Sequence, residues 1–144
     1  MFFAVPPIRK RRYRNTEQPM TYNELLHYVF QAECKLFMKM DSWRVIKQKC
    51  SIKCFNPIER EQLEEDIHHV FELLIKMMKQ SCANLTKEDI VFCCLVKLGL
   101  DNAVISRCLG SPDKRAANQR KYRIKIKMQE AQCQQLFEII FDNK

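Results

Sequence analysis

The sequence predicts an all-α fold, and both its composition and its periodicity indicate helices. Nearly half of the 144 residues (47%) are apolar, but only two are glycine and five are proline, which suits helices joined by few tight turns. Apolar residues also recur at three- and four-residue spacing through most of the chain. A chain of this length makes one domain, or a small domain with a helical extension, so we expect a single core.

The first segment, residues 1–20, is predicted to be a flexible basic arm, because no helical spacing precedes Pro19. Residues 1–8 are mostly apolar, and basic residues follow at Arg9, Lys10, Arg11, Arg12 and Arg14. An apolar end followed by Arg and Lys is also how a membrane-spanning helix meets the cytoplasm. The segment is therefore either a functional arm or the stub of a membrane anchor in a truncated gene.

Residues 21–82 are predicted to be a helical extension or linker domain. The first helix covers 21–40 and starts with a capping box, in which Glu24 lies three residues after Thr21. The apolar residues whose spacing predicts this helix are Leu25, Tyr28, Val29, Ala32 and Leu36.

A long helix is predicted over 57–80, after a shorter one within 41–55. Asn56 followed by Pro57 has the form of a helix cap and a first-turn proline, and acidic residues follow where they complement the helix dipole. The apolar stripe of this long helix consists of Ile67, Val70, Phe71, Leu74 and Met78.

Residues 85–142 are predicted to be a domain of three or four short helices. Thr86 would cap the first helix, which runs to Leu98 and stops at Gly99 in the left-handed conformation. The second helix covers 102–109. The residues expected to face inward are Ile90, Val91, Cys94, Leu95 and Leu98 in the first helix and Val104, Ile105 and Leu109 in the second.

A third helix is predicted over 112–128, after a turn at Gly110. Ser111 would cap it and Pro112 would take its first position. Residues 129–141 carry apolar residues at helical spacing and would either pack on the domain or form a dimer face. Three short helices joined by tight turns are the pattern of a helix-turn-helix unit, here without a wing.

The distribution of charge favours an anionic partner. The formal net charge is +8, and basic residues crowd into 112–128, whereas 59–66 is acidic. A basic excess confined to one predicted helix resembles a phosphate-binding face. The alternative is a solvated basic helix on a protein that binds no nucleic acid, but such a protein has no need of so short a middle helix.

The helix over 112–128 meets the two demands on a DNA recognition helix, which must pack on its scaffold and also present donors to DNA. Ala117, Ile124 and Met128 fall on one stripe suited to packing. The candidate base readers, early on the helix, are Lys114, Arg115, Asn118, Gln119 and Tyr122. The candidate phosphate contacts are Ser111, Arg120, Lys121, Arg123, Lys125 and Lys127.

The same region resembles the LuxR/GerE-type helix-turn-helix effector domain. The family's usual run is Leu-Thr-x-x-Glu, Gly-x-Ser-Asn-x-x-Ile-Ala, Leu-x-x-Ser and a helix ending Ile-x-x-Lys-Leu. The matching segments are Leu85-Thr86-Lys87-Glu88, Gly99-Leu100-Asp101-Asn102, Ile105-Ser106, Leu109-Gly110-Ser111-Pro112 and Arg123-Ile124-Lys125-Ile126-Lys127-Met128. Their order and most of their spacings agree, although the stretch between Leu109 and Ile124 is one residue longer than the family pattern.

Residues 92–99, together with the long helix ahead of them, also resemble the cytoplasmic end of membrane-linked regulators of anaerobic gut bacteria. In those proteins, sensor and helical-repeat regions precede a similar DNA-binding tail. The resemblance implies a bacterial, sequence-specific transcription regulator that binds double-stranded DNA through a recognition helix in the major groove. It leaves the signal unassigned.

Other classes of protein fit the sequence less well. Eight cysteines without a secretory signal indicate reduced thiols in the cytoplasm, and no stretch approaches the roughly 20 apolar residues that span a bilayer. Cys50 and Cys54 have loose spacing to the adjacent His68 and His69, so no metal is expected. No cysteine lies near a histidine such as His27 in a catalytic pattern, so we expect no enzyme, cofactor or small-molecule substrate. The aromatic residues expected in the core are Phe30, Phe37, Phe71 and Phe92.

The remaining alternative is a protein-interaction or anti-regulatory module without DNA binding. In that case the helices over 21–40 and 57–80, or the segment 129–141, would pair with another chain. The two functions can coexist, since DNA readers often dimerise. A homodimer is expected to form through 129–141 or through the 57–80 helix.

Overall fold

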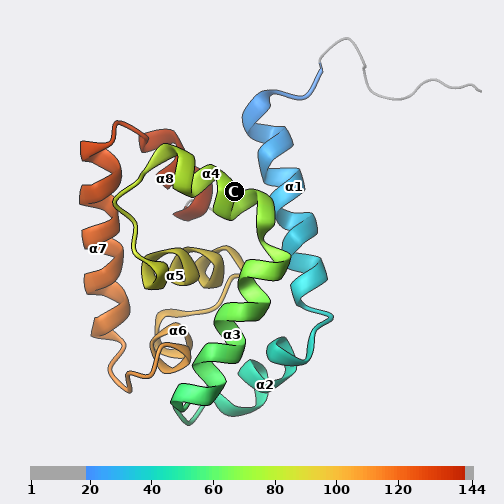
Figure 1. Ribbon diagram of the computed structural model, residues 1–144, viewed down its shortest axis with the longest axis vertical. Coiled ribbons are helices and arrows are strands. Elements are labelled where there is room, and N and C mark those ends of the chain that lie inside the picture. Colours follow the sequence, from blue (N-terminus) through green and yellow to red (C-terminus); the bar gives the residue numbers. More distant parts are fainter. Residues whose placement is uncertain (1–18, 142–144) are drawn as a thin grey trace, which may run out of the picture.

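The computed structural model describes residues 19–141, and every regular element within that range is a helix. Helix α7 lies along one edge of the molecule and α1 along the opposite edge, with α5 between them (Figure 1). The helices are α1 Tyr22–Phe37, α2 Asp41–Lys49, α3 Pro57–Val70, α4 Glu72–Ser81, α5 Lys87–Lys97, α6 Asn102–Cys108, α7 Arg115–Glu130 and α8 Gln134–Phe141. The predicted all-α class is confirmed for the described residues, and the predicted basic arm lies outside them up to residue 18.

Three helices begin where their capping signals predict. The side chains of Thr21, Asn56 and Thr86 each accept a hydrogen bond from the amide three residues later, and an acidic side chain at that third residue accepts from the amide of the cap. Each pair satisfies two backbone donors that would otherwise lack a partner at a helix start. The expected starts of α1, α3 and α5 are therefore confirmed.

The apolar residues whose spacing predicts α1 are not the ones that it buries. Leu25, Tyr28 and Leu36 are 49%, 68% and 57% exposed. The buried side chains of α1 are Leu26, Phe30, Cys34 and Phe37. Helix α1 has two apolar stripes, and the one that carries both phenylalanines faces the core.

The prediction of one long helix over 57–80 is wrong. The helix is interrupted at Phe71, and the two resulting helices, α3 and α4, run in different directions (Figure 1). Phe71 is fully buried against Phe37, with ring centroids 5.8 Å apart. The carboxylate of Glu33 in α1 accepts hydrogen bonds from the amides of Leu73 and Leu74, at 2.9 and 3.3 Å. Glu33 thus stabilises the new helix start, where free amides and the helix dipole favour an acceptor.

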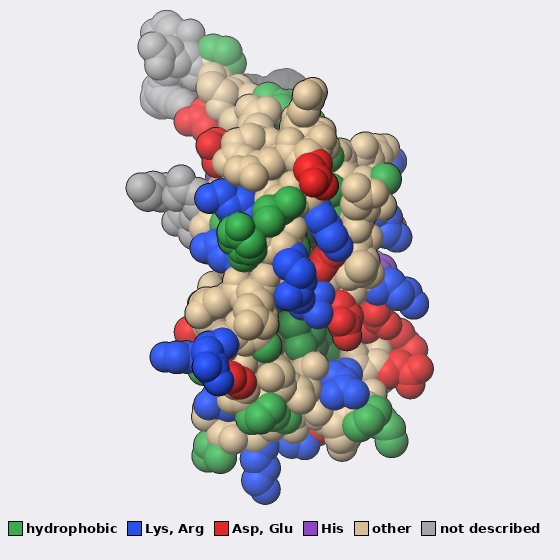
Figure 2. Space-filling view, turned by 90° about the vertical axis from the view of Figure 1, so that its left-hand side faces the viewer, with side chains coloured by type: hydrophobic (Ala, Val, Ile, Leu, Met, Phe, Trp, Pro, Cys, Tyr) green, Lys and Arg blue, Asp and Glu red, His purple; other side chains and the backbone are tan. Residues whose placement is uncertain are grey.

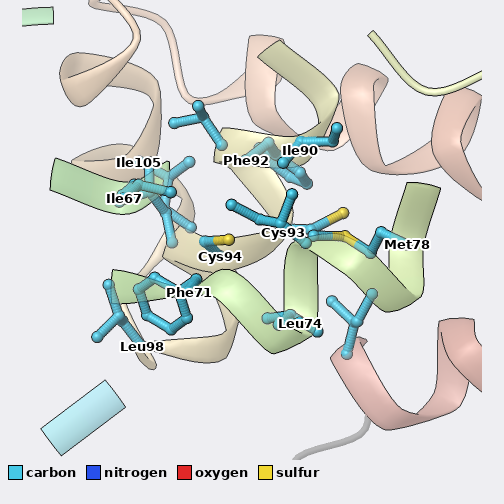
Figure 3. Close-up of a cluster of buried hydrophobic side chains, with 14 of the residues drawn as sticks. Ile67, Phe71, Leu74, Met78, Ile90, Phe92, Cys93, Cys94, Leu98 and Ile105 are labelled. Atoms are coloured by element: carbon cyan, nitrogen blue, oxygen red, sulfur yellow. The ribbon is translucent and has the colours of Figure 1, made fainter. Parts of the chain in front are cut away.

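The core is a single cluster of buried side chains drawn from α1 to α8, as the chain length predicts. Its centre is α5, which contacts α1, α3, α4, α6 and α8 and is buried without interruption from Asp89 to Leu95 (Figure 3). The four expected core phenylalanines, Phe30, Phe37, Phe71 and Phe92, are all fully buried. Buried residues before 82 and after 85 belong to the same cluster, so the two predicted regions share one core.

The eight cysteines are all free thiols. Burial raises the pKa of Cys93 and Cys94, which lie at the centre of the core (Figure 3). They stay protonated and fill space as small apolar side chains. Within residues 19–141, no helix has the length and apolar character that crossing a bilayer requires.

Candidate nucleic-acid interface

Two glycine turns set the positions of α5, α6 and α7. Gly99 follows α5 with a φ of +85°, and Gly110 follows α6 with a φ of +90°. Both values lie in the left-handed region that glycine adopts without steric cost. The predicted breaks at Gly99 and Gly110 are confirmed, and they leave α6 only seven residues long.

The predicted start of the third helix is wrong, because α7 begins at Arg115 and not at Pro112. Ser111 belongs to the end of α6 instead: its amide donates to the carbonyl of Ser106 at 2.8 Å, while the amide of Gly110 donates to that of Arg107 at 3.1 Å. This pair of hydrogen bonds is the Schellman ending of a helix. Ser111 is therefore half-buried a turn before α7 and does not cap it.

The start of α7 takes its hydrogen-bond acceptors from other residues. The hydroxyl of Ser106, which is buried in α6, accepts from the amide of Ala117 at 3.2 Å. The carboxylate of Asp113 accepts from the amide of Arg115 at 2.9 Å. Ser106 thereby connects α6 to the first turn of α7. In the sequence, Ser106 was singled out only as part of the Ile105-Ser106 motif, and nothing there pointed to its hydrogen bond with Ala117.

Helix α7 presents one flank to the core and the other to solvent. The expected packing residues Ala117, Ile124 and Met128 are buried. The opposite flank is exposed, and Lys and Arg side chains run down the middle of this side of the molecule, with acidic side chains gathered at the lower right (Figure 2). The exposed residues of this flank are Lys114, Arg115, Asn118, Gln119, Tyr122, Arg123 and Lys125. Lys121 is exposed too, but its ammonium lies over the ring of Phe141 in α8, 5.3 Å from the ring centroid. All five candidate base readers therefore lie on one open surface.

Two of the candidate base readers have polar neighbours. The amide oxygen of Asn118 accepts from the side chain of Asn102 at 2.6 Å. The guanidinium of Arg115 pairs with the carboxylate of Asp113 at 2.8 Å, and both groups are exposed. Exposed pairs of this kind contribute little to stability, so Asn118 and Arg115 can exchange these partners at small cost.

Two of the candidate phosphate contacts hold the fold together. Asp89 of α5 is almost fully buried, and its carboxylate lies 2.8 Å from Arg120 and 2.6 Å from Lys127, both of α7. Burial raises the pKa of this carboxyl, but the hydrogen bonds from Lys127, the Thr86 amide and Arg120 outweigh burial and leave the pKa below its usual value. Arg120 also pairs with Glu88 at 2.9 Å. The structure thus places Arg120 and Lys127 on the inner side of α7, where they join it to α5.

Arg107 was missed by the sequence reasoning. It lines a shallow hollow beside the start of α7, together with Lys114 and Arg115. Its guanidinium donates to the carbonyls of Cys50 and Ser51, at 2.9 and 3.2 Å, and so fixes the loop after α2 to the end of α6. No local pattern signals this residue, because its partners lie more than 50 positions earlier.

Among residues 19–141 there is no group of three histidine, cysteine or acidic side chains that could hold a metal ion. Cys50 and Cys54 therefore form no such group with His68 and His69. Cationic and amide side chains predominate on α7 itself, and the acidic side chains beside it include Asp113 and Glu88.

The turn at Gly110 provides a test of how α7 is positioned. A Cβ at Gly110 would clash with the guanidinium of Arg60, whereas a Cβ at Gly99 would meet nothing within 4 Å. We expect Gly99→Ala to lower the free energy of unfolding by about 1 kcal/mol through backbone strain alone. Gly110→Ala should cost about 1–2 kcal/mol, because the guanidinium end of the flexible Arg60 side chain must also swing aside. Urea unfolding of both variants measures the difference.

The double variant Gly110→Ala/Arg60→Ala is the control for this contact. Removal of the Arg60 side chain should bring the cost of Gly110→Ala close to that of Gly99→Ala. Equal losses in the two single glycine variants would show that Arg60 does not add to the cost of Gly110→Ala.

No family model, no curated protein and no solved structure matches this chain. The described part of the protein is an all-helical domain that carries an exposed, basic and amide-rich helix at one edge.

Proposed function

We propose that this protein is a cytoplasmic bacterial transcription regulator that binds double-stranded DNA in a sequence-specific manner, with α7 as its recognition helix. In this proposal α5, α6 and α7 form a LuxR-like helix-turn-helix unit, and α8 is its fourth helix. The observation that carries the proposal is the division of α7 into a seated flank and an open cationic flank. A helix that only increased solubility would not need to pack on the two shorter helices α6 and α8 after two glycine turns.

The dimensions of α7 suit the major groove. Its 16 residues give a length of about 24 Å, and the groove, about 12 Å wide, admits a helix. In this docking the first turns of α7 enter the groove. Arg115 can pair bidentately with guanine, and Asn118 or Gln119 with adenine.

The phosphate contacts in this proposal come from the outer flank alone. Lys121, Arg123 and Lys125 are exposed and would position α7 on the backbone without reading sequence. Arg120 and Lys127 form ion pairs with Asp89 of α5 and are not assigned to DNA. Ser111, a turn ahead of α7, is not assigned to DNA either.

Selection of bound fragments from a random duplex pool tests the proposal. We expect enrichment of a defined sequence by the intact chain. Asn118→Ala or Gln119→Ala should change the preferred base at one or two positions by about 10-fold, since one good bidentate contact gives about 1–3 kcal/mol of discrimination.

Gln129→Ala is the matched control, because Gln129 is exposed on the same helix but three turns further on. Its preference should equal that of the unaltered chain. Absence of any enrichment would favour the interaction module over the DNA regulator. An unchanged preference in the Asn118 and Gln119 variants would show that other residues read the bases.

A further inference from the structure

Two cysteines that are far apart in the sequence meet at the last turn of α7. Cys82 follows α4, and its thiol donates a hydrogen bond to the carbonyl of Lys127, with the sulfur 3.7 Å from the oxygen. The thiol of Cys133 donates to the next carbonyl of α7, that of Met128, at 3.4 Å. The end of α4 therefore lies beside the turn between α7 and α8 (Figure 1).

The ending of α7 fixes the position of Cys133. Gln132 has a φ of +58°, in the left-handed region, and its amide donates to the carbonyl of Gln129 at 3.1 Å. The amide of Cys133 donates to the carbonyl of Met128 at 2.9 Å. These two hydrogen bonds form a Schellman ending, so the backbone and the thiol of Cys133 are both held against the last turn of α7.

The thiols of Cys82 and Cys133 lie within hydrogen-bonding distance of each other. Burial, and then the neighbouring Cys82, raise the pKa of the Cys133 thiol. Cys82 is only 1% exposed, whereas Cys133 is partly exposed and lines a hollow with Asn23, Met77 and Leu136. A small solute can therefore reach one thiol of the pair, while the other thiol is buried beside it.

The other cysteines lack this combination of contact and access. Cys50 and Cys108 also form a hydrogen bond between their thiols, but both are fully buried. Cys54 is partly exposed, but within residues 19–141 no hydrogen bond joins it to another thiol. Cys82 and Cys133 are thus the pair in which a reachable thiol has a second thiol at hand.

We propose that Cys82 and Cys133 are a modification site at which hydrogen peroxide forms a disulfide bond. The thiolate of Cys133 attacks one peroxide oxygen, the O–O bond breaks, and a sulfenic acid forms while the released hydroxide takes up the thiol proton as water. Cys82 then attacks the Cys133 sulfur, the S–O bond breaks, and a second water leaves with the Cys82 proton. In sum, two thiols and one peroxide give one disulfide and two waters.

This disulfide closes a loop that contains the whole of α5, α6 and α7. A cross-link of this kind restricts the unfolded chain and so favours the folded one. The candidate base readers begin at the first turn of α7, whereas both cysteines lie at its last turn. The site therefore does not depend on the proposed DNA binding, and each proposal can fail without the other.

Oxidation of the intact chain by hydrogen peroxide, followed by tryptic digestion without reductant, tests the pairing. We expect a disulfide that joins peptide 80–87 to peptide 128–144, each of which contains one cysteine. Cys133→Ser should abolish the linked peptide. Cys82→Ser should stop the reaction at the sulfenic acid of Cys133, which dimedone traps. Cys54→Ser is the matched control, because it removes the other partly exposed thiol and should leave the rate of linkage unchanged.

The rate and the stability of the product give two further readouts. Peroxide reacts with the thiolate, and the pKa of Cys133 is raised, so the rate of linkage should rise about 10-fold for each pH unit between about pH 7 and pH 9. The oxidised chain should unfold at about 1–2 M more urea, since closing a loop of about 50 residues stabilises the folded state. Reduction should reverse this shift.

Three results would overturn the site. The first is a disulfide between Cys133 and a cysteine other than Cys82. The second is a disulfide between Cys50 and Cys108 that forms as fast, because access would then not decide which pair reacts. The third is a folded chain in which Cys54 is oxidised while Cys82 and Cys133 both remain free thiols.

Discussion

Replacement of Lys121, Arg123 and Lys125 together by glutamine should lower the affinity for every DNA duplex by about 10²–10³-fold at roughly 0.1 M salt. These three side chains are exposed on α7, and none of them forms an ion pair with an acidic residue in the described part of the chain, although the Lys121 ammonium lies over the ring of Phe141. Each cation that neutralises a phosphate releases counterions, and this release accounts for much of the affinity. Fluorescence anisotropy with a labelled duplex measures the loss.

A second triple variant of the same net charge shows whether the loss of affinity comes from the position of the cations or from the total charge of the protein. Arg44→Gln/Lys47→Gln/Lys76→Gln removes three exposed cations from α2 and α4 and leaves α7 intact. We expect this variant to lose less than about 10-fold in affinity, because distant exposed charges are largely screened. Equal losses in the two triple variants would show that net charge, and not α7, attracts the DNA.

Asp89→Ala should produce the largest loss of stability, about 3 kcal/mol in the free energy of unfolding. The side chain is only 3% exposed, and those of Arg120 and Lys127 are 20% and 28% exposed, so the alanine variant leaves two cations half-buried without their partner. It also removes the capping box of α5, which contributes about 1 kcal/mol. Urea unfolding followed by circular dichroism measures the change.

Glu88→Ala is the matched control for Asp89. Glu88 also pairs with Arg120, but its side chain is 67% exposed. An exposed ion pair of this kind contributes about 0–1 kcal/mol, so the variant should be nearly as stable as the unaltered chain. If Asp89→Ala lowered the free energy of unfolding no more than Glu88→Ala does, the ion pairs of Asp89 with Arg120 and Lys127 would not stabilise the packing of α7 on α5.

The same carboxylate makes stability depend on pH. Because the pKa of Asp89 is lower in the folded chain than in the unfolded chain, its contribution is fully present above the unfolded pKa, about 4, and is lost as the pH falls through the folded pKa. The stability difference between the unaltered chain and Asp89→Asn should therefore be constant near neutrality. It should shrink below about pH 4. A constant difference down to pH 2 would be inconsistent with an ion-paired Asp89.

The features predicted correctly from the sequence depend on neighbours in the chain. Thr21, Asn56 and Thr86 mark helix starts because their partners lie three residues away. Gly99 and Gly110 mark helix ends because the left-handed conformation is a local property. The packing flank of α7 also follows from helical spacing, so the exposed position of the candidate base readers could be anticipated.

The features that were missed depend on contacts between distant segments. The break at Phe71 needs the carboxylate of Glu33, about 40 residues earlier, to cap α4. Lys127 was expected to face DNA, but Asp89 binds it from 38 residues away. For α1, two apolar stripes satisfy the same periodicity, and only the packing of the whole chain selects the one that is buried.

The salt dependence of DNA binding by the intact chain tests the central claim most directly. The association constant for a mixed-sequence duplex should be measured between 50 and 200 mM salt. If Lys121, Arg123 and Lys125 each neutralise one phosphate, the slope of log K against log salt should be about −2.7. A slope shallower than about −1, or no binding at 50 mM salt, would contradict the assignment of the open flank of α7 as a DNA-binding surface.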